Sequence, residues 1–400
     1  MGLHDVVSAE RLHIGFFGMR NAGKSSLVNA VTGQALSVVS DVKGTTTDPV
    51  KKAMELLPLG PVVILDTPGL DDEGELGQLR VQKAKEALAQ TDIAVLVVDA
   101  AIGMTETDTA LEEELKKRKL PYVIAYNKCD LTEGRCGTAE NAVCVSAVTG
   151  EGVQALKERL GDFARTAKKS RVLVADLLSA GDLVVLVTPI DESAPKGRLI
   201  LPQQMTLRDI LDAHATAIVC QPSELTATLQ ALGKKPRMVI TDSQAFGKVS
   251  ALTPPDIPLT SFSILMARYK GDLRALVQGA AELKKLRDGD RVLISEGCTH
   301  HRQCNDIGTV KMPGWIEQYA GAKPVYAFTS GGEFPQDLSE YRVIVHCGGC
   351  MLNEAEMQHR IVRAAEAGVP IVNYGIAIAE MHGILRRSLE LFPDILALLD

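Results

Sequence analysis

Aromatic side chains, long apolar runs and a leader-like start are all missing or scarce in this chain. Only 4% of the 400 residues are aromatic, with a single tryptophan, so aliphatic side chains must dominate the cores. The most apolar stretch, Ile93–Val98, stops at Asp99 and is too short to span a membrane. The first 15 residues carry Asp5, Glu10 and Arg11, which does not fit a signal peptide. We therefore expect no membrane association.

The chain also lacks an excess of basic residues and has few cysteines for its length. The net charge of −7 argues against a broad nucleic-acid surface, and we expect no nucleic-acid partner. Eight cysteines in 400 residues do not make a disulfide framework, and they suit a reducing, cytoplasmic location. Half of them lack ligand-like spacing and are expected to be free thiols: Cys129, Cys136, Cys144 and Cys220.

Short apolar segments alternate with amphipathic helical segments along the whole chain. Apolar runs without alternation indicate strands covered on both faces, hence mostly parallel sheets. We predict three α/β domains: residues 1–170, which bind nucleotide, residues 171–262, and residues 263–400 with a parallel sheet of their own. The predicted strands are His13–Phe17, Val62–Leu65, Ile93–Val98, Tyr122–Tyr126, Ala142–Val145, Leu183–Val187, Ala217–Val219, Met238–Ile240, Arg291–Ser295, Val325–Phe328, Val343–Val345 and Ile371–Asn373.

One glycine-rich segment has the spacing of a phosphate-binding P-loop. It follows the predicted strand His13–Phe17 and opens a helix at Lys24–Ala30. In this context the backbone N–H groups face the phosphates, Lys24 bridges the β- and γ-phosphates, and the Ser25 hydroxyl binds Mg²⁺. The residues predicted to hold the phosphates are Gly18, Asn21, Ala22, Gly23, Lys24, Ser25 and Ser26.

Further motifs follow in the order of a GTP-binding domain. Asp66 is expected to hold Mg²⁺ through water, and the Gly69 N–H to sense the γ-phosphate. The Asp130 carboxylate can accept hydrogen bonds from guanine N1 and the 2-amino group. Adenine lacks both donors, so the motif predicts GTP rather than ATP. Asn127 at the base edge, Lys128 on the base face, and Ser146 and Ala147 with a backbone N–H for guanine O6 complete the predicted site.

A γ-phosphate-sensing switch is expected at residues 44–48. Thr46 is predicted as the Mg²⁺-facing hydroxyl, with Thr45 close behind it. Leu70 follows Gly69 where a water-orienting glutamine would stand, so intrinsic GTP hydrolysis is expected to be slow. The predicted catalytic residues are Lys24, Thr46, Asp66 and Gly69.

A split cysteine cluster lies near the other end of the chain. Cys298 comes just past the predicted strand Arg291–Ser295, and Cys347 and Cys350 come just past Val343–Val345. Ligands bind beyond the carboxyl ends of strands in an open parallel sheet. If the two strands are neighbours, three thiolates can therefore surround one point.

The group that this cluster binds is left open by the residue types. Three cysteines with one histidine (His300, His301 or His346) fit a closed tetrahedral zinc site. They also fit a 4Fe–4S cluster with three thiolates and one labile position. Free thiols are the third reading. Cys304 lies in a predicted loop and is not expected to be a ligand.

The motifs carry two resemblances. With Asn21 in the phosphate loop, the GTPase motifs resemble the TrmE/Era branch, whose members with this asparagine often use K⁺; this makes K⁺ stimulation a hypothesis here. The whole pattern resembles the HydF family of [FeFe]-hydrogenase maturation GTPases over essentially all 400 residues. Its shared segments are Cys298-x-His300, His346-Cys347-x-x-Cys350 and the stretch Pro189–Gln203.

The second resemblance implies a scaffold that carries a two-iron precursor and delivers it to apo-[FeFe]-hydrogenase. It implies a 4Fe–4S cluster in residues 263–400 and a homodimer formed through residues 171–262. Partners would be two radical-SAM maturases and the hydrogenase. The predicted metal ligands are Ser25 and Thr46 for Mg²⁺, and Cys298, His346, Cys347 and Cys350 for the cluster.

Two other functions fit part of the sequence. A TrmE/Era-like RNA- or ribosome-associated GTPase with a structural zinc domain accounts for the N-terminal motifs. It predicts a basic C-terminal surface, whereas glutamates such as Glu333, Glu354 and Glu366 are spread through that part. A metallochaperone in which GTP only stabilises the fold is the other, and measurable GTP turnover would exclude it.

Overall fold

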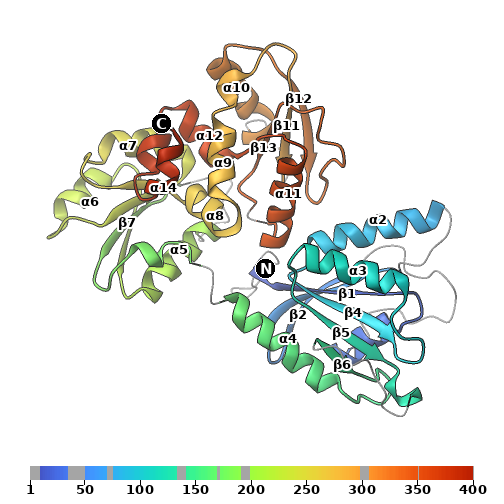
Figure 1. The fold of residues 1–400 in the computed structure, drawn as a ribbon. Helices are drawn as coiled ribbons and strands as arrows, with labels where there is room; N and C mark the ends of the chain where they lie inside the picture. Colours follow the sequence, from blue (N-terminus) through green and yellow to red (C-terminus); the bar gives the residue numbers. More distant parts are fainter. Residues whose placement is uncertain are drawn as a thin grey trace. The chain divides into compact units, whose positions relative to one another are not determined.

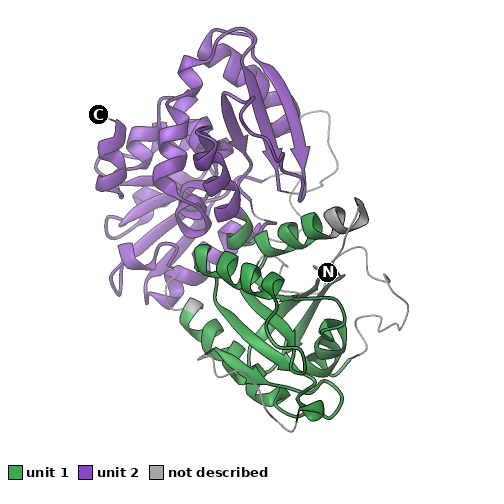
Figure 2. Cartoon of the chain, turned by 45° about the vertical axis from the view of Figure 1, so that its right-hand side comes forward, with its two compact units in different colours: residues 1–170, 353–356 green, residues 171–352, 357–400 purple. Residues whose placement is uncertain are grey.

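The computed structural model describes residues 10–34, 50–69, 75–132, 141–168, 172–190, 199–297, 306–349 and 351–399. The chain divides into two units (Figures 1 and 2). The first consists of residues 1–170 with 353–356, and the second of residues 171–352 with 357–400.

The first unit is built on a six-stranded sheet. Its strand order is β2-β3-β1-β4-β5-β6, and every neighbouring pair is parallel except β2 with β3. Helices α1 and α4 pack on one face and α2 and α3 on the other. The elements are β1 (Leu12–Phe17), α1 (Lys24–Thr32), β2 (Val50–Leu56), β3 (Gly60–Asp66), α2 (Glu75–Ala89), β4 (Ile93–Asp99), α3 (Glu106–Lys117), β5 (Tyr122–Asn127), β6 (Ala142–Cys144) and α4 (Val153–Lys168).

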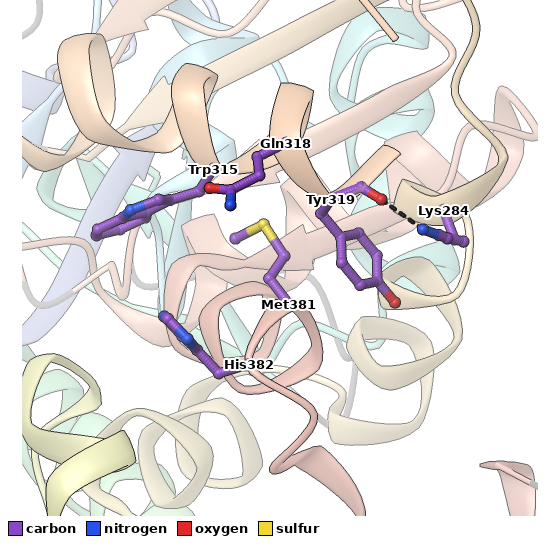
Figure 3. Close-up of a pocket in the computed structure, with 6 residues that line it drawn as sticks. All are labelled: Lys284, Trp315, Gln318, Tyr319, Met381 and His382. Atoms are coloured by element: carbon purple, nitrogen blue, oxygen red, sulfur yellow. Dashed lines mark hydrogen bonds between the residues drawn. The ribbon is translucent and has the colours of Figure 1, made fainter. Parts of the chain in front are cut away.

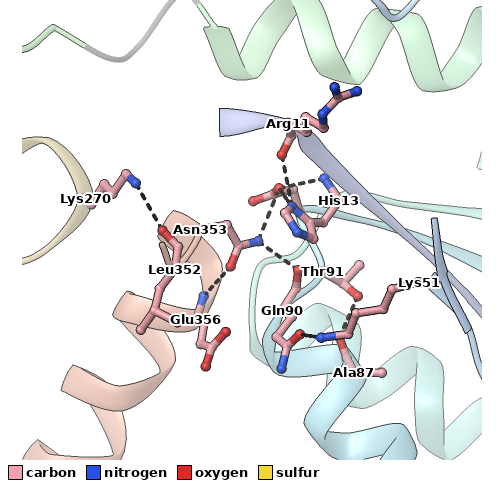
Figure 4. Close-up of polar contacts among 11 residues, drawn as sticks. Arg11, His13, Lys51, Ala87, Gln90, Thr91, Lys270, Leu352, Asn353 and Glu356 are labelled. Atoms are coloured by element: carbon pink, nitrogen blue, oxygen red, sulfur yellow. Dashed lines mark hydrogen bonds and ion pairs between the residues drawn. The ribbon is translucent and has the colours of Figure 1, made fainter. Parts of the chain in front are cut away.

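Polar contacts fix the start of β1, the central strand of this sheet. The His13 backbone N–H donates to Asp92 Oδ2 at 2.9 Å, and His13 Nδ1 lies 2.9 Å from the Arg11 carbonyl oxygen (Figure 4). Thr91 caps the preceding helix by donating its hydroxyl to the Ala87 carbonyl at 2.8 Å. These contacts fix the amino end of β1. The glycine-rich loop follows directly after the carboxyl end of the same strand.

The second unit holds two four-stranded sheets whose neighbouring strands are all parallel. Their orders are β10-β9-β7-β8 and β12-β11-β13-β14. The elements are β7 (Leu183–Val187), α5 (Leu201–Asp212), β8 (Thr216–Cys220), α6 (Leu225–Ala231), β9 (Met238–Thr241), α7 (Phe246–Leu252), β10 (Leu259–Ser261), α8 (Phe262–Lys270), α9 (Leu273–Ala280), β11 (Arg291–Glu296), α10 (Met312–Ala320), β12 (Val325–Ser330), β13 (Val343–His346), α11 (Glu354–Glu366), β14 (Ile371–Asn373), α12 (Tyr374–Met381), α13 (Leu385–Ser388) and α14 (Pro393–Leu396).

Both sheets of the second unit follow one plan. In each, the first strand along the chain lies between the second and the third, and the fourth lies outside the third. Such an order reverses direction between the first and third strands, which here are β7 with β9 and β11 with β13. The carboxyl ends of β11 and β13 therefore meet at a switch point of the sheet.

One continuous core joins the two sheets of the second unit. Buried side chains from the first sheet, such as Leu186 and Ile240, share this cluster with Ile294 and Ile344 of the second. Helix α8 contributes several of its apolar residues to the same cluster. The predicted division after residue 262 falls at the start of this helix.

The fold class is confirmed as α/β with parallel sheets, and most predicted strands recur with ends shifted by one or two residues. Strands β2 and β10 were not predicted. β2 is mostly exposed at the sheet edge and reads Val-Lys-Lys-Ala-Met-Glu-Leu, without the apolar run of a covered strand. β10 is buried but only three residues long. No helix among the described residues is long and apolar enough to cross a membrane.

The cysteine expectation needs one correction. Cys129 and Cys220 are free and buried, as expected. Cys144 is disulfide-bonded, so its prediction as a free thiol is wrong. Spacing along the sequence shows ligand patterns, but it does not show which cysteines a fold brings together. Cys136 lies outside the described residues.

Candidate functional site

The glycine-rich loop joins β1 to α1 in the shape that phosphate binding needs. Gly23 is the N-cap of α1, with φ of 86°. A Cβ atom at Gly23 would lie 2.3 Å from Asn127 Nδ2, so only glycine fits there. Asn21 is exposed and also has a positive φ of 60°, a conformation that asparagine adopts more readily than most residues.

Lys24 opens helix α1 with its side chain buried against the loop. Its Nζ donates to the carbonyl oxygens of Gly18 at 2.9 Å and Met19 at 2.7 Å. The ammonium group is therefore held inside the curve of the loop, at the positive N-terminal end of the helix. That arrangement suits an anion bound by the loop N–H groups.

Ser25 and Asp66 come together at the carboxyl ends of β1 and β3, which are neighbours in the sheet. The Ser25 hydroxyl donates to Asp66 Oδ2 at 2.7 Å. Asp66 is 1% exposed, and its Oδ1 is buried without a hydrogen-bond partner among the described residues. A buried carboxylate oxygen without a donor is costly, and Mg²⁺ or its bound water would satisfy it. These residues fit the predicted magnesium site.

Asn127 ties the base motif to the phosphate loop. Its Nδ2 donates to the Ala22 carbonyl at 2.9 Å, and its Oδ1 accepts the Ala147 N–H at 3.1 Å. The side chain is 2% exposed and used at both ends. Asn127 therefore braces the loop against the Ser146–Ala147 segment, and its place at the base edge stays a prediction.

The remaining base-site residues lie at the carboxyl ends of β5 and β6. Lys128 has a φ of 66°, and its Nζ donates to Asp99 Oδ2 at 2.6 Å. Asp130 is exposed, with its carboxylate open to a ligand. The Ser146 N–H donates to the Glu151 carbonyl oxygen at 2.9 Å, so it is not available to guanine O6. A guanine base there would share the Ala147 N–H with Asn127.

Several predicted residues fall where the structure gives no description. Ser26 and Gly69 are described and partly buried, in α1 and after β3. Thr45 and Thr46 of the switch, and Leu70, lie outside the described residues. So do Cys298, His300, His301, Cys304 and Cys350.

Cys347 lies at the switch point of the second unit's second sheet. β11 and β13 are neighbours, with Ser295 paired to His346. The Cys347 Sγ accepts the Gly297 N–H at 3.0 Å and the Gly349 N–H at 3.4 Å. Backbone donors aimed at one sulfur stabilise a thiolate, the form that binds metal. Gly297 directly precedes Cys298, so the two predicted ligands leave adjacent strand ends.

His346 is arranged differently from its prediction. It is 0% exposed, its Nδ1 lies 2.7 Å from the Cys347 carbonyl oxygen, and its Nε2 lies 2.9 Å from Arg360 Nη1. Both ring nitrogens of His346 therefore have partners inside the protein. The sequence pattern placed His346 beside the cysteines but could not show which way its ring turns.

A buried tyrosine lies at the carboxyl end of β11, close to Cys347. Tyr374 at the start of α12 donates its hydroxyl to Glu296 Oε1 at 3.2 Å. Burial raises the pKa of Tyr374 far above its usual value, and the nearby Glu296 and Cys347 raise it further. The hydroxyl therefore stays protonated as a donor at the carboxyl end of β11.

A pocket of about 310 Å³ lies elsewhere in the second unit (Figure 3). The lone tryptophan, Trp315, lines it with Tyr319, Met381 and His382. No residue that the sequence predicted for a site contributes to it. Among the described residues no group of three or more histidine, cysteine or acidic side chains could hold a metal ion.

Sequence reasoning missed two partners of these sites. Asp99, which anchors Lys128, ends a strand that was predicted, so its place at the site edge could have been noted. Arg360 lies inside an ordinary amphipathic helix, and nothing in its spacing indicates contact with His346.

Three family models match the chain. Residues 173–271 match the hydrogen maturase F dimerization domain, and residues 274–391 match the hydrogen maturase F tetramerization domain. Residues 13–128 match the family described as 50S ribosome-binding GTPase. The chain belongs to the hydrogen maturase F family. This family assignment confirms the resemblance to HydF, and the GTPase match confirms the class of the first unit.

Curated relatives of this chain include tRNA modification GTPases. The tRNA modification GTPase MnmE of Laribacter hongkongensis is 36% identical over 156 residues, 38% of this chain and 34% of that protein. MnmE of Chromobacterium violaceum has the same identity and coverage. The chain thus spans about a third of the length of these relatives.

Solved structures show only weak overall similarity. The G domain of the T. maritima FeoB iron transporter is 24% identical and covers 39% of this chain and 99% of its own, with a TM-score of 0.31. Aquifex aeolicus Era bound to GDP and aluminium fluoride is 16% identical, covering 80% and 92%, with a TM-score of 0.34. Scores of this size add nothing to the assignment.

Proposed function

We propose that the first unit of this hydrogen maturase F family member binds Mg²⁺ and GTP and hydrolyses GTP to GDP and phosphate. The loop shape, the buried Lys24 and the unpartnered Asp66 Oδ1 support this proposal. Mg²⁺, when bound, neutralises charge on the β- and γ-phosphates. Ser25 would bind it directly and Asp66 through water. Lys24 would exchange its loop carbonyls for phosphate oxygens.

Hydrolysis by this unit would be slow and stimulated by K⁺. Leu70 has no group to orient the attacking water, so rate acceleration rests on charge stabilisation. Asn21, exposed at the tip of the loop, carries an amide that can bind a monovalent cation beside the phosphates. Thr46 remains the proposed second hydroxyl for Mg²⁺, and the Gly69 N–H the proposed γ-phosphate sensor.

The second unit would hold a 4Fe–4S cluster at the carboxyl edge of β11 and β13. The N–H groups aimed at Cys347 Sγ support a thiolate ligand there. Cys298 and Cys350 would supply the other thiolates. Since both ring nitrogens of His346 are used, the fourth iron position would be left for an exchangeable ligand. A cluster of this kind, when bound, supplies a site to which a second iron unit can attach.

The whole protein would act as a cytoplasmic scaffold in [FeFe]-hydrogenase maturation. It would receive a two-iron precursor from radical-SAM maturases and pass it to apo-hydrogenase, as a homodimer formed through residues 171–262. Family membership over residues 173–391 is the observation that carries this proposal. GTP cleavage would time partner exchange by changing the switch loops.

An activation assay tests the scaffold proposal. Precursor-loaded protein is mixed with apo-hydrogenase, and hydrogen evolution is recorded beside the same mixture made with Cys347→Ser. We expect activation only with the wild-type protein. Activation by the cysteine variant, or by neither protein, would contradict the delivery role.

The names of the relatives favour one competing function. MnmE acts on tRNA by its name, and the GTPase family model is named for ribosome binding. An RNA-associated GTPase with a zinc domain is therefore the second candidate. Retention of RNA by the purified protein, with stoichiometric zinc in place of iron, would favour it.

A further inference from the structure

Arg360 is the largest fully buried side chain among the described residues. It lies in α11 and is 1% exposed. A guanidinium in the interior is costly unless hydrogen bonds and ring contacts surround it. Its Cζ lies 5.1 Å from the centre of the Phe334 ring, and its two Nη atoms donate to the groups described next. A charge kept inside the protein at this cost points to a role beyond packing.

The guanidinium of Arg360 joins the carboxyl ends of three neighbouring strands. Nη1 donates to Ser295 Oγ of β11 at 3.3 Å and to His346 Nε2 of β13 at 2.9 Å. Nη2 donates to the carbonyl oxygen of Gly331, just past β12, at 2.9 Å. Ser295 also accepts the Thr329 hydroxyl at 3.0 Å. Arg360 therefore sets the spacing of the strand ends from which the predicted cysteine ligands leave.

The same contact fixes the proton on His346. Arginine can only donate, so Nε2 must accept. The ring then carries its proton on Nδ1, which donates to the Cys347 carbonyl oxygen at 2.7 Å. Hydrogen bonds therefore link Arg360 to His346 and His346 to the backbone carbonyl of Cys347. The Sγ of the same cysteine accepts the Gly297 N–H.

We propose that Arg360 and His346 are positioning residues for the cluster site, and that His346 is not a ligand. Arg360 holds the ends of β11 and β13 together, and His346 fixes the peptide plane of Cys347. Together they keep Cys347 in place at the carboxyl edge of the sheet. The inference rests on the proposed cluster.

The first test replaces Arg360 and compares it with its neighbour on α11. Arg363 also packs on Phe334, at 5.5 Å, and donates to the Pro335 carbonyl at 2.7 Å, but none of its described contacts reaches β11 or β13. After anaerobic reconstitution, we expect Arg360→Gln to bind the cluster about 10- to 100-fold more weakly and to shift its midpoint potential. Arg360→Lys should recover part of the loss, and Arg363→Gln should match the wild type. Equal occupancy and potential in Arg360→Gln and Arg363→Gln would overturn the proposal.

The second test asks whether His346 touches the cluster. In protein labelled with ¹⁵N-histidine, pulsed EPR of the reduced cluster should show no strong coupling to an imidazole nitrogen. His346→Asn keeps a short side-chain N–H near the position of Nδ1, so its EPR signal should stay close to that of the wild type. A strong imidazole coupling that disappears in His346→Asn would make His346 a ligand and end the proposal.

The positioning role can also be measured on protein without a cluster. Iodoacetamide alkylation of Cys347, followed by peptide mass spectrometry, reports how firmly its thiol is held. We expect several-fold faster alkylation in Arg360→Gln than in Arg363→Gln. Equal rates would overturn the positioning role. If wild-type protein binds no cluster at all, the proposed function fails, while this measurement still decides whether Arg360 holds Cys347 in place.

Discussion

Nucleotide choice depends, at the scale of single residues, on the exposed carboxylate of Asp130. In Asp130→Asn the amide cannot accept from both guanine donors, and hydrogen bonds to a charged group are worth about 1.5–3 kcal/mol. We expect GTP affinity to fall roughly 10- to 100-fold, on the scale of 1.4 kcal/mol per tenfold. Xanthosine triphosphate, with a carbonyl in place of the 2-amino group, should gain relative affinity. Unchanged GTP binding in calorimetry would contradict the base-site assignment.

A substitution of Asn21 can show whether this residue binds K⁺ or only stabilises the turn of the phosphate loop. Its φ of 60° is free for glycine, so Asn21→Gly keeps the loop shape and removes only the amide. We expect the wild type to hydrolyse GTP faster in K⁺ than in Na⁺, and Asn21→Gly to show equal rates in both. A K⁺ preference that persists in Asn21→Gly would assign the asparagine to the turn alone. Wild-type rates equal in K⁺ and Na⁺ would remove the K⁺ hypothesis.

Single residues also show how far sequence reasoning reaches. Lys24, Ser25 and Asp66 could be predicted because their spacing after apolar strands repeats a chemistry that needs those groups. The ring direction of His346 could not be predicted, because it depends on Arg360, a residue 14 positions away whose helix looks ordinary. Side-chain partners of this kind are set by packing between elements.

At the scale of elements, the turn after β13 depends on Gly349. Its φ is 61°, and an added Cβ would lie 2.6 Å from Met357 Sδ. Gly349→Ala should lower the free energy of unfolding by about 1–3 kcal/mol through backbone strain, and more where Met357 cannot move. We also expect less iron per chain, since the Gly349 N–H contacts Cys347 Sγ.

Gly383 provides the matched control for this turn. Its φ is 69°, but no atom lies within 4 Å of the Cβ that alanine would add. Gly383→Ala should therefore show the strain cost in thermal unfolding without a change in iron content. Equal iron content in Gly349→Ala and Gly383→Ala would show that the turn at Gly349 does not contribute to iron binding.

Strands could be predicted from the sequence where their burial produces a continuous run of apolar residues. Covered strands such as β4 and β7 appear as continuous apolar runs, and both were predicted. The exposed edge strand β2 has no such run. The two sheets of the second unit share one strand order, but the sequence contains no short repeat that indicates it. Strand order depends on how the strands are connected and not on their composition.

At the scale of the whole molecule, the two proposed activities lie in different units. Lys24→Ala removes the ammonium that would bridge the phosphates, so we expect GTP hydrolysis to fall to background. The cluster should be retained, because its proposed ligands lie in the second unit. Phosphate release and iron content measured on one preparation check both points. Loss of iron in Lys24→Ala would contradict independent units.

Self-association is also expected at this scale. Both family models of the second unit are named for it, one for dimers and one for tetramers. The resemblance to the family implied the dimer only, and no residue pattern marked an interface. Light scattering across a concentration series would give the size of the assembly.

The central claim is that the thiolates at the edge of β11 and β13 hold an iron–sulfur cluster. The most direct measurement is the reduced EPR spectrum of anaerobically reconstituted protein, recorded beside that of Cys347→Ser. We predict a 4Fe–4S signal in the wild type that is lost or altered in the variant. Stoichiometric zinc without a cluster signal would contradict the account and favour the RNA-associated GTPase with a zinc domain.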